Sequence, residues 1–214
     1  MHQKINVGCG TNPTPGWLNL DNSPSVLLGR VPAVMTLLAA TGVLRGMRLD
    51  FAKAAQAGGV RWANARHLPV ADASTEVIYS SHMLEHLEPS EARRFLAEVR
   101  RVLIPGGILR LGVPDLALMV RGYAEDKDAN RFIHGTLLAQ PQPRSLRDRL
   151  GFLINGHRGH AWMYDGPSLI QLLTEEGFAD VAEVRAGETK IPDPGALDLR
   201  EREDETVYVE GRKA

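Results

Sequence analysis

Apolar positions fall into short runs separated by glycine, proline and polar residues, and this pattern predicts alternating strands and helices. Strands are predicted at residues 5–7, 17–20, 60–63, 76–82 and 108–113. Helices are predicted where apolar residues recur at helical spacing: over 26–38, 50–56, 92–103 (opened by Pro89 and closed by Pro105-Gly106-Gly107) and after Pro167. Strand, helix and strand in this order are typical of a parallel sheet with right-handed crossovers.

Two further strands are predicted near the end of the chain, and their connection differs from the others. Residues 179–185 and 206–210 both alternate, and a charged link with Pro and Gly over 190–205 joins them without a helical pattern. An antiparallel hairpin at the sheet edge follows. The predicted fold class is therefore α/β: a doubly wound, mostly parallel seven-stranded sheet with helices on both faces and a C-terminal antiparallel hairpin.

The length of the chain and its irregular stretches define the predicted domain organisation. A chain of 214 residues suits one domain with a substantial core, so residues 1–214 are predicted to form a single domain. A helical insertion is predicted at about 24–58 and a cap or substrate insertion at about 116–165, where the pattern becomes less regular.

Residues 26–44 are almost continuously apolar, which leaves a membrane span, a membrane-surface patch and a buried or lid helix to be distinguished. Arg30 and Pro32 disfavour a span, and a span between two strands would pull the sheet apart. A cap or core helix is the favoured interpretation. Peripheral membrane contact through 26–44 and a homo-oligomer interface remain open.

Composition and charge narrow the classes of partner and the compartment. Lys plus Arg (25) nearly balances Asp plus Glu (26), so nothing in the charge indicates a nucleic acid partner. Cys9 is the only cysteine, which excludes an intramolecular disulfide and a cysteine-rich zinc site and favours a cytoplasmic location. Because the first strand begins near Lys4 or Ile5, no secretion leader is expected ahead of it.

Two glycines directly after the first strand, Gly8 and Gly10, predict a tight turn in which the backbone can approach a ligand. The second strand ends at Asp21, and a carboxylate at a strand tip beside a glycine turn can accept both hydroxyl groups of a ribose. Asn64, after the third strand, either bonds the edge of an adenine or simply forms a turn. Together these positions predict a nucleoside site.

Polar and aromatic residues that could contact a substrate or carry a proton gather in two places. Ser81 and His82 lie where the fourth strand ends, and His86 follows shortly after, as a catalytic or a buried structural residue. The segment 156–165 contains the other candidates, which could instead only pin the loop: His157, His160 and Tyr164. No metal site is predicted, because no third ligand accompanies His157 and His160 in the sequence.

In this order, the motifs resemble those of the class I S-adenosylmethionine-dependent methyltransferases, and within them the small methyltransferase-11 type. The likeness rests on residues 7–10, Asp21, 68–72, 80–87 and 101–107, together with the fifth strand and the closing hairpin. The resemblance implies that S-adenosylmethionine is the cofactor and that the fold is Rossmann-like. The cofactor-binding residues that it implies are Gly8, Cys9 and Gly10 under the amino-acid part, Asp21 at the ribose, Asn64 and Ala65 beside the adenine, and Ser81 and His82 near the methionine end.

Several positions depart from the family pattern. Asn6 replaces the acidic residue two places before the first glycine, and Asn12 replaces the third glycine of the loop. Asn64 stands where aspartate is more frequent, and Thr75-Glu76 replaces the usual Phe-Asp. Because Gly10 and Asp21 are close in sequence, the intervening helix is predicted to be shortened or replaced by a loop through Pro13 and Pro15.

The implied activity is methyl transfer from S-adenosylmethionine to a small-molecule, sugar or lipid-linked glycan acceptor by in-line displacement. Alignment of the nucleophile with the methyl group would be the main contribution, with a general base in addition. The candidates for the base are His82, His86, His157 and His160. The alternative is a non-catalytic protein that binds S-adenosylmethionine or S-adenosylhomocysteine and acts through partners; the missing third glycine and the closing hairpin disfavour a nicotinamide-dependent oxidoreductase.

Overall fold

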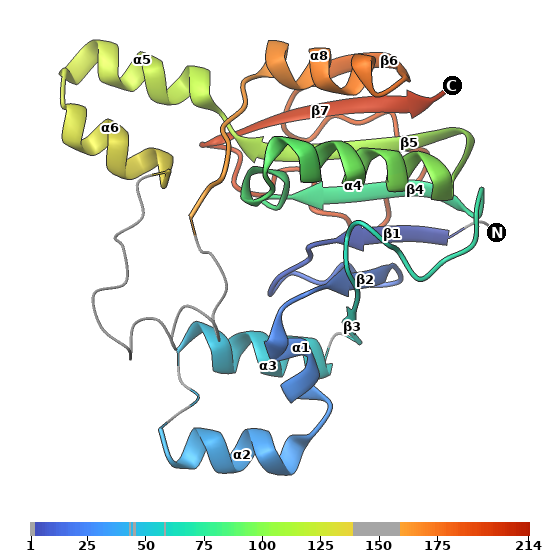
Figure 1. Cartoon of the computed structure of the whole chain (residues 1–214), viewed down its shortest axis with the longest axis vertical. Helices are drawn as coiled ribbons and strands as arrows, with labels where there is room; N and C mark the ends of the chain where they lie inside the picture. Colours follow the sequence, from blue (N-terminus) through green and yellow to red (C-terminus); the bar gives the residue numbers. More distant parts are fainter. Residues whose placement is uncertain (1–2, 43, 45, 58, 139–158) are drawn as a thin grey trace.

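The computed structural model describes residues 3–42, 44, 46–57, 59–138 and 159–214, and of Met47 and Arg48 only the backbone. Seven strands form one sheet in the order β3-β2-β1-β4-β5-β7-β6 (Figure 1). The strands are β1 (Gln3–Val7), β2 (Leu18–Asp21), β3 (Arg61–Trp62), β4 (Thr75–Ser81), β5 (Leu103–Pro114), β6 (Phe178–Val184) and β7 (Thr206–Lys213).

The strands β1 to β5 are parallel, and the sheet closes with antiparallel pairing. β1 pairs with β2 and β4, and β4 pairs with β5, all in parallel. β7 runs antiparallel between β5 and the edge strand β6. The predicted mixed seven-stranded sheet with its C-terminal antiparallel pair is confirmed, and it places the carboxyl ends of β1, β2 and β4 at one edge of the molecule.

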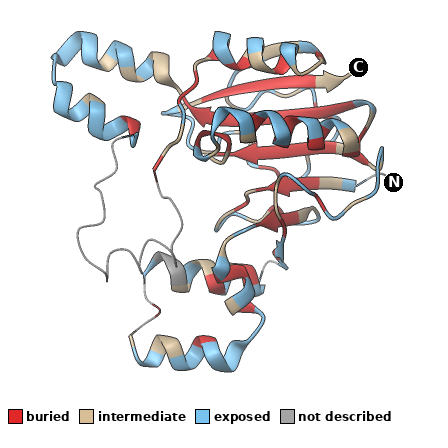
Figure 2. Ribbon diagram, viewed as in Figure 1, coloured by how far each residue is buried: buried red, intermediate tan, exposed pale blue. Residues whose placement is uncertain are grey.

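Helices α4 (Pro89–Val102) and α8 (Gly166–Glu175) cover one face of the sheet. Alternate strand residues such as Ile78, Leu109 and Val209 are fully buried against apolar residues of these helices, including Phe95 and Leu169. Figure 2 shows these strands as mostly buried and the outer faces of both helices as exposed. Burial of one stripe of each helix explains its hydrophobic period, whereas the central strands β4 and β5 are buried on both faces of the sheet.

The connection between β6 and β7, residues 185–205, contains no helix and covers part of the opposite face of the sheet. Its residues Ile191 and Leu197 pack on Val77, Tyr79 and Ile108 of the central strands. A fully buried ion pair holds it there: Arg110 Nη1 lies 2.7 Å from Glu210 Oε1, and the same guanidinium donates to the carbonyl oxygens of Glu188 and Leu199. Because both charges are paired and hydrogen-bonded, their burial can be tolerated.

Two groups of helices extend beyond the sheet. Helices α1 (Pro24–Gly29), α2 (Pro32–Ala40) and α3 (Met47–Ala57) lie between β2 and β3 in sequence, and α1 packs on α3. Helices α5 (Leu116–Asp126) and α6 (Ala129–Thr136) follow β5, and the structure places them beside its carboxyl end (Figure 1). Within the described residues, no helix is both long and apolar enough to cross a membrane.

The structure corrects several predicted boundaries. The third strand has two residues instead of the four predicted, because as an edge strand it pairs only with β2. The helix after Pro89 ends at Val102, and Pro105-Gly106-Gly107 lies inside the first part of β5, where the register with β4 shifts. A 3-10 turn, η1 (Leu84–His86), follows the end of β4. Between Gly8 and Trp17 the chain forms turns without a helix, as predicted from Pro13 and Pro15.

Candidate functional site

The first feature of the site is the turn that joins β1 to the tip of β2. Gly8 and Gly10 both adopt positive φ angles, 72° and 53°, which glycine accommodates without the penalty of a side chain. A Cβ atom at Gly8 would lie 2.6 Å from Met83 Cγ, so the turn also touches the segment after β4. The amides of Gly8 and Cys9 donate to the carbonyl oxygen of Leu20, at 2.8 and 3.3 Å.

Asp21 connects this turn to β2. Its Oδ2 accepts from the amide of Gly10 at 3.1 Å, and its Oδ1 accepts from the amide of Ser23 at 2.7 Å. Burial raises the pKa of the Asp21 carboxyl, and the two backbone hydrogen bonds oppose that shift. Since each carboxylate oxygen carries two lone pairs and uses one, Asp21 keeps acceptor capacity for the hydroxyl groups of a ribose.

Asn6 and Asn12, the two departures from the family pattern, have structural partners. Asn6 Nδ2 donates to Thr14 Oγ1 at 3.0 Å and to the carbonyl oxygen of Asn12 at 3.3 Å. Asn12 Nδ2 donates to Glu201 Oε1 at 2.9 Å. These amides hold the loop after the glycine turn against β1 and against the connection between β6 and β7.

The side chain of Cys9 is part of a small apolar cluster. It is buried with Val26, Ala55 and Val60 between the turn and helices α1 and α3. Burial raises the pKa of the thiol to about 12, with the charge of Asp21 adding to the shift. Cys9 can therefore contribute only backbone atoms to a ligand.

Asn64 and Ala65, predicted beside the adenine, form a turn after β3. Asn64 Oδ1 accepts from the amide of Arg66 at 3.0 Å, and a single bridge pairs Asn64 with His67. Ala65 packs partly buried against the main core. The side-chain oxygen of Asn64 thus stabilises a turn, which was one of the two predicted roles. Its predicted role at the adenine gains no direct support from this contact.

Ser81 and His82 end the central strand β4, at the same edge as the glycine turn. The backbone of His82 is left-handed, with φ at 49°, which is uncommon for a residue with a side chain. His82 Nε2 lies 2.8 Å from Thr206 Oγ1, and that hydroxyl donates to the carbonyl oxygen of Arg202. Because the hydroxyl proton is already used, Nε2 must be the donor, and in neutral His82 the atom Nδ1 carries a bare lone pair.

Glu85 is the functional candidate that the sequence analysis missed. Its side chain is 1% exposed, and neither carboxylate oxygen has a hydrogen-bond partner. Around Oε1 lie His82 Nδ1 at 3.4 Å, His86 Nε2 at 4.0 Å and His160 Nε2 at 4.0 Å. A buried carboxylate without hydrogen bonds is costly unless a cation or a proton lies beside it.

Backbone contacts bring His160 to this carboxylate from 75 positions further along the chain. The amides of Ala161 and Trp162 donate to the carbonyl oxygen of Glu85, at 2.7 and 3.1 Å. In return, His86 Nδ1 lies 2.9 Å from the carbonyl oxygen of Gly159. The rings of His86 and His160 meet edge to face, with their centroids 5.2 Å apart. Burial lowers the pKa of His160, while the carboxylate of Glu85 opposes that shift.

Two catalytic candidates remain, Tyr164 and His157. Tyr164 is buried in the main core, and desolvation raises its pKa to about 12, so it holds its proton at neutral pH. His157 lies outside the described residues. Of the five residues predicted as catalytic, the structure therefore brings three together: His82, His86 and His160.

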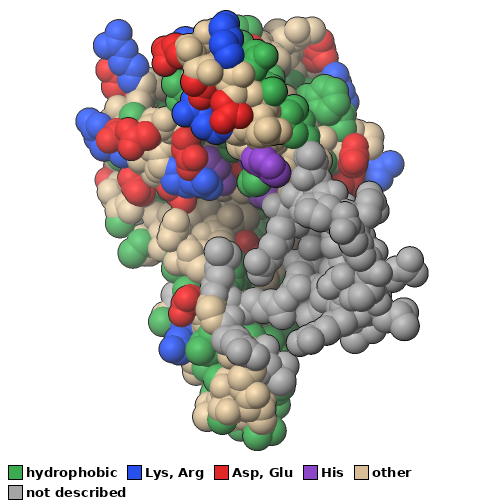
Figure 3. Space-filling model, turned by 90° about the vertical axis from the view of Figure 1, so that its left-hand side faces the viewer, with side chains coloured by type: hydrophobic (Ala, Val, Ile, Leu, Met, Phe, Trp, Pro, Cys, Tyr) green, Lys and Arg blue, Asp and Glu red, His purple; other side chains and the backbone are tan. Residues whose placement is uncertain are grey.

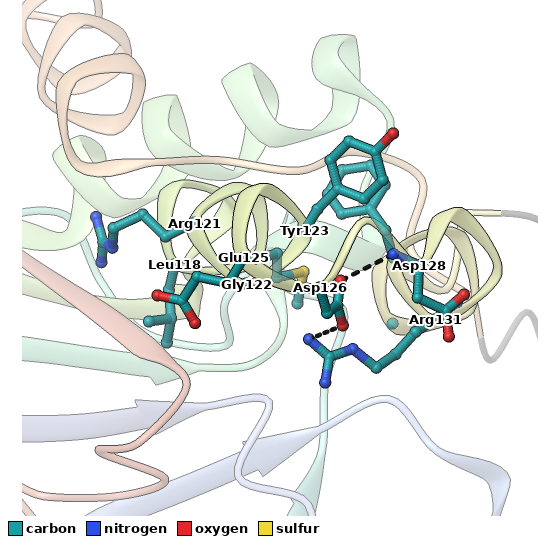
Figure 4. Close-up of a pocket in the computed structure, with 11 residues that line it drawn as sticks. Leu118, Arg121, Gly122, Tyr123, Glu125, Asp126, Asp128 and Arg131 are labelled. Atoms are coloured by element: carbon teal, nitrogen blue, oxygen red, sulfur yellow. Dashed lines mark hydrogen bonds and ion pairs between the residues drawn. The ribbon is translucent and has the colours of Figure 1, made fainter.

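Histidine side chains gather on the face of the molecule onto which the carboxyl ends of the parallel strands open (Figure 3). A separate cavity of about 410 Å³ lies at the helix pair α5 and α6, where Asp126 pairs with Arg131 (Figure 4). The residues lining that cavity all belong to 118–135, so none of them is a predicted cofactor residue. The cavity is distinct from the glycine turn and from the Glu85 cluster.

Comparison with known proteins identifies relatives of this chain. A family described as a methyltransferase domain matches residues 5–111. The chain is 33% identical over 116 residues to O-methyltransferase resE of Aspergillus sclerotiorum, and 29% identical over 118 residues to a Mycolicibacterium smegmatis protein described as a probable S-adenosylmethionine-dependent methyltransferase. These matches cover 53% and 55% of this chain, but only 39% and 43% of the two relatives.

Solved structures show the same fold. A methyltransferase from Thermotoga maritima aligns over 100% of this chain and 83% of its own, with a TM-score of 0.56 and 17% identity. A second, from Methanosarcina mazei, aligns over 99% of this chain and 92% of its own, with a TM-score of 0.50 and 16% identity. At this identity the likeness concerns the fold alone.

Proposed function

Since the chain belongs to the S-adenosylmethionine-dependent methyltransferase-domain family, we propose that it transfers the methyl group of this cofactor to a hydroxyl of a small-molecule, sugar or lipid-linked glycan acceptor. The observation that carries the proposal is Nδ1 of His82, which has no hydrogen-bond partner, lies 3.4 Å from Glu85 Oε1 and is one residue from the Met83 side chain that touches Gly8. A proton acceptor thus adjoins the turn to which the family pattern assigns the cofactor.

The residues at the glycine turn fit the cofactor. S-adenosylmethionine, when bound, supplies a methyl group on a positively charged sulfur. Gly8 and Gly10 leave the edge of the turn free of side chains, and Asp21 keeps lone pairs for ribose hydroxyl groups.

The acceptor end would supply orientation and a base. A hydroxyl proton would pass to His82 Nδ1, while Thr206 holds the opposite ring nitrogen and thereby fixes the tautomer. The oxygen would form a bond to the methyl carbon as the bond from that carbon to sulfur breaks. His86 and His160 would hold the acceptor next to Glu85.

A non-catalytic binding protein is the second candidate, favoured by one observation. The amides of Gly8, Cys9 and Gly10 already have partners inside the protein, so none of them is committed to a ligand. This reading predicts binding of S-adenosylmethionine or S-adenosylhomocysteine without turnover.

Calorimetric titration and a turnover assay separate these proposals. We expect S-adenosylmethionine to bind and NAD not to bind. Release of S-adenosylhomocysteine is then measured with a panel of small hydroxyl compounds, nucleotide sugars and lipid-linked sugars. Turnover with any of them supports the enzyme; binding without turnover across the whole panel favours the non-catalytic protein, and no binding contradicts both.

We also propose that the apolar surface of α1 and α2 contacts a lipid-bearing acceptor or a bilayer. A homo-oligomer that uses this surface is a further proposal. Leu27, Val31, Val34 and Leu37 are each between 43% and 62% exposed. Such a surface can lie in a bilayer interface without spanning it. Co-sedimentation with vesicles should fall when Val34 and Leu37 are both changed to Ser, and unchanged sedimentation would remove the membrane from the proposal.

A further inference from the structure

The cluster around Glu85 has the composition and the proton arrangement of a metal site. One carboxylate oxygen and two imidazole nitrogens, from Glu85, His86 and His160, all lie within 4.8 Å of one another. Two histidines and a carboxylate are a common ligand set for zinc, and sites with three protein ligands leave a coordination position for water or substrate.

A hydrogen bond to the far nitrogen of His86 selects the tautomer that a metal requires, and a contact at the far nitrogen of His160 orients that ring. The carbonyl oxygen of Gly159 can only accept, so His86 Nδ1 is the protonated nitrogen and Nε2 carries the lone pair that faces Glu85. His160 Nδ1 lies 3.3 Å from Met163 Sδ, which orients Nε2 toward the same carboxylate. Ligating histidines usually have such a partner on the other ring nitrogen.

Glu85 provides the independent indication that something is bound here. Its carboxylate is almost completely buried, and both oxygens lack hydrogen-bond partners although three histidine rings surround one of them. An unpartnered buried carboxylate beside three imidazole rings is stabilised only when a proton or a metal cation lies between them.

We propose that Glu85, His86 and His160 bind one divalent transition-metal ion such as Zn²⁺, which holds the oxygen of the methyl acceptor. The role at the acceptor rests on the proposed function, whereas binding of the ion does not. In a tetrahedral zinc site with bonds of about 2.0–2.1 Å, ligand atoms lie about 3.4 Å apart. The three side chains therefore need only small rotations to close around the ion.

The metal would contribute to methyl transfer through the acceptor. A metal-bound hydroxyl releases its proton more easily, because the cation stabilises the oxyanion. His82 Nδ1, 3.4 Å from Glu85 Oε1, is available to take that proton. The acceptor class is then an alcohol, phenol or sugar hydroxyl that can reach a metal ion, rather than an amine that is already protonated.

The test uses the full chain without a histidine tag, stripped of metal with a chelator and then titrated with ZnCl₂ in a calorimeter. We expect one Zn²⁺ per chain, and a loss of affinity of at least tenfold in each of Glu85→Gln and His160→Ala. His67→Ala is the matched control, because His67 is exposed and contributes no ligand atom to the cluster. Binding of Co²⁺, followed by its visible absorption band, reports the ligand geometry.

Circular dichroism of each variant confirms that it is folded, and Glu85→Gln retains the shape of the side chain if His160→Ala does not fold. No stoichiometric Zn²⁺ binding by the wild type, or undiminished binding by folded Glu85→Gln, overturns the metal site. S-adenosylmethionine is titrated into the same preparations. Cofactor binding without Zn²⁺ binding refutes the metal alone, and Zn²⁺ binding without cofactor binding refutes the proposed function alone.

Discussion

The glycine turn and the Glu85 cluster lie at the same edge of the sheet, but they differ in how far their polar groups are hydrogen-bonded. At the turn, the amides of residues 8–10 and both oxygens of Asp21 have partners inside the protein. In the cluster, both oxygens of Glu85 and Nδ1 of His82 are buried without one.

This difference indicates that the glycine turn is a preformed support for a ligand, whereas the Glu85 cluster is the reactive part of the site. A turn whose hydrogen bonds are complete keeps its shape with or without a ligand, and it can present a nucleoside without rearranging. Unpartnered buried groups cost stability, and such groups are commonly found at functional sites. The comparison predicts that changes at the turn affect stability and cofactor affinity, whereas changes in the cluster affect turnover.

The largest effect is expected for Glu85→Gln. Removing the charge should lower kcat by about 10²–10⁴-fold, the range typical of a lost acid-base or electrostatic contribution. Affinity for S-adenosylmethionine should change little. The rate of S-adenosylhomocysteine release with the best acceptor measures the first quantity and calorimetry the second; unaltered kcat would show that the cluster is only structural.

Substitution of Gly8 should mainly reduce stability. In Gly8→Ala, the positive φ costs about 1–2 kcal/mol and the overlap with Met83 adds about 1–3 kcal/mol. The matched control is Gly16→Ala, where φ is also positive, at 81°, but no atom lies within 4 Å of the new Cβ. Denaturant unfolding of both variants isolates the Met83 contribution, and equal losses would show that the turn does not press on the segment after β4.

Asp21→Asn should weaken binding of S-adenosylmethionine by about 1.5–3 kcal/mol, the usual contribution of a hydrogen bond to a charged group. Asp50→Asn, on the exposed side of α3, serves as the control. Calorimetric titration gives the affinities. If Asp21→Asn bound the cofactor as tightly as Asp50→Asn, the carboxylate would not hold the ribose.

The smallest effect concerns Cys9, which should be inert in the folded protein. A thiol with its pKa raised to about 12 stays protonated at pH 8, and burial also blocks reagents. Ellman's reagent should therefore react with Cys9 only as fast as the turn opens, and fully after unfolding in denaturant. Rapid reaction in native buffer would mean that the folded turn does not bury the Cys9 thiol.

Much of the fold could be predicted because the apolar pattern of each segment indicates which of its residues are buried. Alternating residues such as Val77 and Ile78 face opposite sides of the sheet, and the proline and glycine turns separate the elements. The predicted boundaries were wrong where contacts with neighbouring strands decide them. The strand β3 is short because it is an edge strand, and the segment 105–107 lies within β5 at the point where its register with β4 shifts.

The site residues that could be predicted are those that lie at the ends of strands. Gly8, Asp21 and His82 could be found because turns and polar residues follow apolar runs. Glu85 was overlooked because a glutamate after a strand is usually exposed, and its burial depends on the segment 159–162 folding back onto η1. The adjacent pair Glu85-His86 together with a distant histidine in a glycine-rich loop was the available signal.

The most direct test of the account is a crystal structure of the protein with S-adenosylhomocysteine. The account predicts the ribose hydroxyl groups at about 2.6–3.2 Å from the Asp21 carboxylate and the sulfur on the side of His82 and Glu85. A nucleoside bound away from Asp21, or a sulfur directed away from the Glu85 cluster, would contradict it.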